Sequence, residues 1–81
     1  MTKYPKLCKV EALENHNLIL YFSNNEKKIF DFNSYLTHPY YQNLKNYAFF
    51  KNIALKDGEL EWATGQDFCP HTLYENSVNI E

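Results

Sequence analysis

A chain of 81 residues has room for one hydrophobic core, and this shortness limits its fold more than any other feature. A domain of this size buries only about 60% of the surface of its unfolded chain, so its core must be dense or cross-linked. Aromatic side chains make up 17% of the residues, and each buried ring removes on the order of 150–250 Å² from water. We therefore expect a single aromatic-rich domain over residues 1–81 that needs no disulfide bond.

The first 32 residues have the alternation of a three-stranded antiparallel meander. Strands are predicted over residues 7–13, 18–22 and 28–32, with polar turns between them. Alternation assigns each strand an apolar face, and together these faces comprise Cys8, Val10, Ala12, Leu18, Leu20, Phe22, Phe30 and Phe32. We expect the pair Lys27-Lys28 to be solvated, because lysines on an edge strand block further strand pairing.

The middle of the chain predicts two short helices. Asp31 and Asn33 are good N-cap residues for a helical turn that Pro39 would end. Residues 40–44 follow as a compact linker, and Asn46 can cap the second helix.

The last third predicts a second hairpin and a closing helix. Asp57-Gly58 is a two-residue turn between strands over residues 53–56 and 59–62. Pro70 favours a helix that runs to about Ser77 and presents Leu73, Tyr74 and Val78 to the body. The expected fold is α+β, with a small antiparallel sheet formed by the meander and the second hairpin, and two or three short helices.

Charge argues against several classes of function. All eight basic residues are lysines and the formal net charge is −2, so the guanidinium fork that clamps phosphate or guanine is missing. Direct nucleic-acid binding is therefore not expected. Glu59 and Glu61 share a strand face, and we interpret them as solvated acids rather than an acid/base pair.

Metal and cysteine chemistry are the sharper alternatives. Asp67, Cys69 and His71 alternate beside a helix start, and all three are zinc ligand types. A structural zinc site needs four ligands, and the second cluster is missing. A nucleophilic Cys69 would need a base, yet residues two apart on a helix do not face each other. We expect a non-enzyme with no catalytic residue, cofactor or metal.

The N-terminus is too polar for a signal peptide, and the longest apolar run, Leu18 to Phe22, is far shorter than a membrane span. These features favour a cytoplasmic protein without a membrane segment, in which Cys8 and Cys69 stay reduced.

The run from Gly58 to Glu75 resembles the end of a prokaryotic family known as domain of unknown function 2442, in which some relatives carry an added helix-turn-helix. Members typically read Trp-Pro-Asn-Gly-x-Asp-Leu-x-Pro-Glu-x-Leu-Tyr. The matching residues at the same spacing are Trp62, Gly65, Asp67, Pro70, Leu73 and Tyr74. Ala63, Thr64 and His71 depart from the pattern, which affects the turn geometry and the local charge.

The resemblance implies a small α+β fold without an assigned activity, and genes that often neighbour another short protein, as in toxin–antitoxin pairs. Our leading hypothesis is a non-catalytic protein-interaction domain, antitoxin-like, with a small basic partner encoded nearby; a homodimer would use the same surface. A nucleic-acid-associated regulatory module is the alternative, and a small hydrolase or metal protein comes third. The candidate partner surface comprises Trp62, Asp67, Tyr74, Tyr40 and Tyr41, with a structural role in closing the fold as the competing interpretation.

Overall fold

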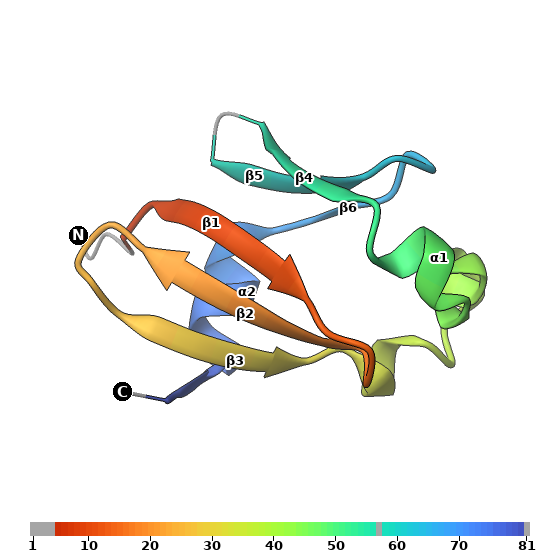
Figure 1. Ribbon diagram of the computed structural model, residues 1–81, viewed down its shortest axis with the longest axis horizontal. Helices are drawn as coiled ribbons and strands as arrows, with labels where there is room; N and C mark the ends of the chain where they lie inside the picture. Colours follow the sequence, from red (N-terminus) through yellow and green to blue (C-terminus); the bar gives the residue numbers. More distant parts are fainter. Residues whose placement is uncertain (1–4, 57, 81) are drawn as a thin grey trace.

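The computed structural model describes residues 5–56 and 58–80, which form two antiparallel sheets and several short helices (Figure 1). The strands are β1 (Leu7–Ala12), β2 (Asn17–Phe22), β3 (Lys27–Asp31), β4 (Ile53–Lys56), β5 (Glu59–Trp62), β6 (Asp67–Phe68) and β7 (Val78–Asn79). The helices are the 3-10 helices η1 (Asn33–Tyr35) and η2 (Pro39–Lys45), and the α-helices α1 (Tyr47–Phe50) and α2 (Pro70–Asn76). This architecture confirms the α+β fold.

The meander and the second hairpin belong to different sheets. The meander extends to a four-stranded sheet in the order β1-β2-β3-β7, and the hairpin to a three-stranded sheet in the order β4-β5-β6. The predicted pairs of the hairpin are confirmed, with Ile53 opposite Trp62 and Leu55 opposite Leu60. Gly58 has a φ of +80°, as a tight turn requires, whereas Asp57 lies outside the described residues.

The core-facing residues of β2 and β3 are those that alternation predicted, but β1 departs from it. Leu18, Leu20 and Phe30 are at most 2% exposed. In β1 the pairing shifts between Leu7 and Lys9, so Cys8 is the extra residue of a β-bulge and its side chain is exposed. The prediction that Cys8 shares the apolar face was wrong, because the bulge returns Leu7 to the core.

The two turns of the meander use positive φ angles. Asn25 takes a φ of 72° in the second turn, as expected for Asn, but His16 rather than Asn takes 64° in the first. The His16 ring packs on Phe50 with centroids 4.7 Å apart, and its Nε2 lies 3.0 Å from the carbonyl oxygen of Leu44. These contacts tie the first turn to the helical segment.

Pro39 does more than end the first helical turn. The N-cap position of η1 is Phe32, without a side-chain cap, rather than Asp31 or Asn33 as predicted. The Asp31 side chain still accepts a 2.9 Å hydrogen bond from the backbone N–H of Asn33, the first residue of η1. Pro39 then stands at the first position of η2. The predicted linker over residues 40–44 is therefore helical, since the fixed φ of proline suits a first helical position. Asn46 caps α1 by accepting from the N–H of Ala48, as predicted.

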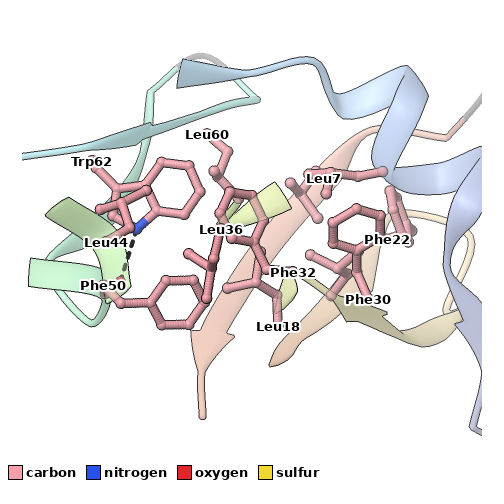
Figure 2. Close-up of a cluster of buried hydrophobic side chains, with 12 residues drawn as sticks. Leu7, Leu18, Phe22, Phe30, Phe32, Leu36, Leu44, Phe50, Leu60 and Trp62 are labelled. Atoms are coloured by element: carbon pink, nitrogen blue, oxygen red, sulfur yellow. Dashed lines mark hydrogen bonds between the residues drawn. The ribbon is translucent and has the colours of Figure 1, made fainter. Parts of the chain in front are cut away.

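The core is an aromatic cluster between the two sheets. Phe32, at the end of β3, is fully buried and contacts rings from η1, η2, α1, β5 and β6. Trp62 is 1% exposed, and its indole N–H donates a 2.8 Å hydrogen bond to the carbonyl of Phe50, drawn as the dashed line in Figure 2. The two sheets are thus joined by ring packing rather than by a shared strand.

The closing helix confirms Leu73 as a core residue and corrects two other expectations. Val78 does not pack on the body but lies on β7, with 65% of its surface exposed. Lys28 is only 9% exposed, and its ammonium lies 4.3 Å from the centre of the Tyr74 ring. Because β7 pairs with β3, β3 is an inner strand and its lysine pair is not an edge feature.

Candidate functional site

The outer side of the three-stranded sheet gathers acidic side chains. In β5, Leu60 points to the core, so Glu59 and Glu61 point outward, as alternation predicted. Asp67 in β6 pairs with Glu61 and therefore stands on the same side. Lys56 pairs with Glu59 from β4. We call Glu59, Glu61 and Asp67 the acidic face; its three carboxylates stand against one lysine.

The acidic face is hollowed. A depression of about 320 Å³ is lined by Glu59, Asp67, Phe68, Cys69 and Pro70. A second, of about 240 Å³, shares Glu59 and Asp67 and extends to Lys56, Leu60 and Glu61. Carboxylates therefore border the half-buried Phe68 of β6, an arrangement that suits a cationic side chain with an aliphatic stem.

Four of the five candidate partner residues lie near one another, around Tyr41. The Tyr41 ring centre is 4.8 Å from that of Tyr40 and 6.4 Å from that of Trp62, and its hydroxyl donates to the backbone carbonyl of Asp67 at 3.5 Å. Desolvation raises the pKa of the Tyr41 hydroxyl above its usual value. Exposure differs within the group: Tyr40 is 54% exposed and Asp67 is exposed, while Trp62 is buried.

Tyr74 is separate from this group and joins α2 to the meander. Its ring packs edge-on against Phe22 with centroids 5.0 Å apart, and its hydroxyl donates to a carboxylate oxygen of Glu26. That hydrogen bond is the main cause that lowers the pKa of the Glu26 carboxyl and raises the pKa of Tyr74. These contacts fit the fold-closing interpretation of Tyr74.

A buried amide that the sequence analysis did not single out fixes the position of Tyr40. Gln66 is 7% exposed, and its side chain donates to the backbone carbonyl of Tyr40 and to the Asn43 side chain. Its amide oxygen accepts from the hydroxyl of Thr64. The turn between β5 and β6 is thereby locked to η2. The turn-like composition of residues 63–66 gave no sign of this role, because a polar residue in a turn is usually solvated.

Cys69 stands at the start of α2, where its thiol is exposed. A hydrogen bond from the backbone N–H of Thr72, followed by one from His71, lowers the pKa of the Cys69 thiol. His71 is directed elsewhere, with its Nε2 3.0 Å from a Glu75 carboxylate oxygen. Among residues 5–56 and 58–80, no three His, Cys, Asp or Glu side chains are grouped to hold a metal ion.

We expect Cys69 to react with a thiol reagent several-fold faster than Cys8 near pH 7, because more of it is thiolate. The rate at Cys69 should rise less steeply with pH above neutrality than that of an ordinary thiol, because its lowered pKa leaves less thiol to ionise. Titration with a chromogenic disulfide should give two thiols per denatured chain and two rates in the folded chain. Cys69→Ser should remove the fast rate and Cys8→Ser the slow one; equal rates in both variants would contradict the expectation.

Comparison with known families gives one result. The model of the family described as "Protein of unknown function (DUF2442)" matches residues 8–79, which confirms the resemblance noted in the sequence. No curated protein and no solved structure matches the chain. Within the described part of the chain, no helix is long and apolar enough to cross a membrane.

Proposed function

The chain belongs to the DUF2442 family of proteins of unknown function, and from this premise we propose that it is a non-catalytic protein-interaction domain whose acidic face holds a small basic partner. An antitoxin-like pairing with a protein encoded beside it is the form we favour. The observation that carries the proposal is the hollowed surface where Glu59, Glu61 and Asp67 stand on one side of β5 and β6.

Charge supports a basic partner. The chain has a net charge of −2 and no arginine. Glu59 and Asp67 line both depressions, and Glu61 lines the smaller one. Opposed surface fields speed the encounter of two proteins and suppress wrong pairings. A lysine-rich or arginine-rich segment laid along β5 would meet Glu59 and Glu61 in succession, since they are two residues apart on one side of a strand.

The shape of the two depressions favours binding of a partner's side chains over binding of a small substrate. Enclosed ligand sites surround most of their ligand, whereas these depressions, of about 240 and 320 Å³, lie open on the outside of a sheet. The half-buried Phe68 adds apolar surface beside the carboxylates, and Tyr40, 54% exposed, offers an aromatic contact on η2.

The test is co-expression of the chain with the small protein encoded beside its gene, followed by purification through a tag on one of them. We expect the wild-type chain to form a one-to-one complex with this protein. In the double variant Glu59→Gln/Glu61→Gln, the complex should dissociate at least tenfold faster or associate at least tenfold more slowly. Raising salt from 0.05 to 0.5 M should weaken the wild-type complex in the same direction.

The matched control is Glu14→Gln combined with Glu75→Gln, which removes the same charge from exposed positions outside the acidic face. Equal weakening by both pairs would indicate a general charge effect and count against the acidic face. If the chain does not bind the neighbouring protein but retards short duplex DNA in a gel, the result would favour the hypothesis of a nucleic-acid-associated regulatory module. Stoichiometric zinc in the purified protein would favour the third hypothesis.

A further inference from the structure

The four-stranded sheet has an outer side on which charged and apolar residues form ordered rows. The strand pairing places Lys9, Tyr21 and Lys27 in one row. The next row runs through Glu11, Ile19, Ile29 and Val78, and the third contains Asn17 and Asp31. We call these three rows the outer face. It has lysines at one end, aliphatic residues along the middle and a carboxylate at the other end.

Apolar exposure on the outer face increases towards β7. Ile19 is 9% exposed, Ile29 is half-buried and Val78 is 65% exposed, while Ile80, just past β7, is 42% exposed. Helix α2 packs on the opposite side, through Tyr74 on Lys28. Figure 1 shows the outer face turned to the viewer, and no other element of the described residues lies over it. The half-buried Ile29 and the exposed Val78 and Ile80 thus form a small apolar patch at the β7 side of this face, of the kind found at association surfaces.

The charges at the two ends are available for a partner. Lys27 lies over the Tyr21 ring, 5.4 Å from its centre, and forms no ion pair within the described residues. Asp31 is exposed, and hydrogen bonds from the Asn33 backbone and side chain lower the pKa of its carboxyl. Lys9, by contrast, is already 3.5 Å from Glu11. The free opposite charges are thus both on β3, two residues to either side of Ile29.

We propose that the outer face binds a second copy of this chain, face to face, in a two-fold symmetric dimer. The two-fold axis lies in the plane of contact between the copies, perpendicular to the strands and along the row that contains Ile29. The strands of the two copies therefore run in opposite directions across the contact. Each Ile29 and Val78 then meets the same residue of the partner copy, and each Lys27 meets the partner's Asp31. The contact is complementary between Lys27 and Asp31 and between the apolar residues of β3 and β7, as an isologous contact requires. Each Glu11 also meets the partner's Glu11 on the axis, and its charge is offset by the Lys9 ammonium 3.5 Å away in its own copy.

The size of the face sets the strength of this dimer. Four strands span about 19 Å, and the three rows cover a similar length, which is less than the roughly 800 Å² per partner of a standard interface. We therefore expect a weak dimer with a dissociation constant of about 0.1–1 mM. The acidic face lies on the other sheet, so this proposal and the proposed function can fail independently.

Sedimentation equilibrium of the purified chain alone, from about 10 µM to 2 mM, should show the mass rise from one copy towards two. Val78→Lys should weaken the dimer at least tenfold, because it places two ammonium groups against each other on the two-fold axis. Phe49→Lys is the matched control, since Phe49 is also an exposed apolar residue, at 44%, but lies on α1. It should leave the association unchanged.

A charge exchange tests the orientation. Lys27→Glu alone and Asp31→Lys alone should each lose self-association, because like charges then meet, whereas an equimolar mixture of the two should recover it. The Asp31→Lys variant could fail to fold because it loses the hydrogen bond between the Asp31 side chain and Asn33. In that case the comparison of Val78→Lys with Phe49→Lys decides the proposal. A monomer up to 2 mM would overturn it. A dimer that Val78→Lys breaks but Lys27→Glu leaves intact would overturn the face-to-face arrangement and indicate pairing along the edge of β7.

Discussion

Trp62→Ala is expected to remove about 3–5 kcal/mol from the free energy of unfolding, as truncation of a buried aromatic side chain typically does. Trp62 is 1% exposed, with ring centroids 5.1 Å from Phe32 and 5.9 Å from Phe50. The change also leaves the Phe50 carbonyl without its 2.8 Å hydrogen bond. A domain of this length has about 4–12 kcal/mol in total, so the variant should be largely or wholly unfolded at 37 °C.

The measurement is urea denaturation followed by far-ultraviolet circular dichroism, because the variant lacks the only tryptophan. Trp62→Phe keeps a ring but loses the indole N–H, and should give an intermediate loss. Phe49→Ala is the control, since Phe49 lies in the same helix as Phe50 but is 44% exposed, and should cost little. A denaturation midpoint that barely moves in Trp62→Ala would mean that the indole does not join the two sheets.

Phe32→Ala should be comparably damaging, again by about 3–5 kcal/mol. Phe32 is fully buried and lies within 5.1–5.7 Å of five rings, measured between centroids. These rings belong to Tyr35, Tyr41, Phe50, Trp62 and Phe68. Truncation would open a cavity bordered by five different elements, and rigid neighbours on several sides can collapse into it only in part.

A double-mutant cycle between Phe32→Leu and Trp62→Phe tests whether these rings act together. Because the two side chains are in contact, we expect a coupling energy of about 0.5–3 kcal/mol. The matched cycle pairs Phe32→Leu with Tyr40→Phe; Tyr40 is 54% exposed, and this pair should be additive. Additivity in both cycles would refute the role of Phe32 as the centre of the core.

The parts of the fold that followed from the sequence are those fixed by local periodicity or by one residue. Alternation was enough to place Leu18, Leu20 and Phe30 in the core, because a strand with one buried face repeats every two residues. The cap at Asn46 and the helix start at Pro70 were also correct, since each depends on backbone groups within a few positions.

The parts that did not follow depend on contacts between distant segments. The bulge at Cys8 is set by pairing with β2, and strand β7 exists only because residues 78–79 reach β3. Neither contact leaves a mark on the local pattern. The burial of Lys28 arises in the same way, since the Tyr74 ring that covers it is 46 positions along the chain.

In the candidate site, too, some features follow from the local sequence pattern and others depend on contacts between distant segments. The outward direction of Glu59 and Glu61 was predictable from alternation, but their gathering with Asp67 depends on the register of β5 with β6. The proximity of Tyr41 to Asp67 and the locking role of Gln66 depend on how η2 packs on the turn after β5. Sequence alone gave Tyr41 and Asp67 as candidates, but it did not single out Gln66 and could not say which residues meet.

The bulge at Cys8 also affects how the chain behaves when crowded. The four-stranded sheet has two edges, and a straight exposed edge invites other chains to add strands without limit. At β1 the extra residue twists the strand and interrupts its regular row of backbone donors and acceptors. At β7 the edge is only two residues long. Each edge is thus a poor template for fibril growth, so copies that meet through this sheet should stop at a closed pair instead of polymerising.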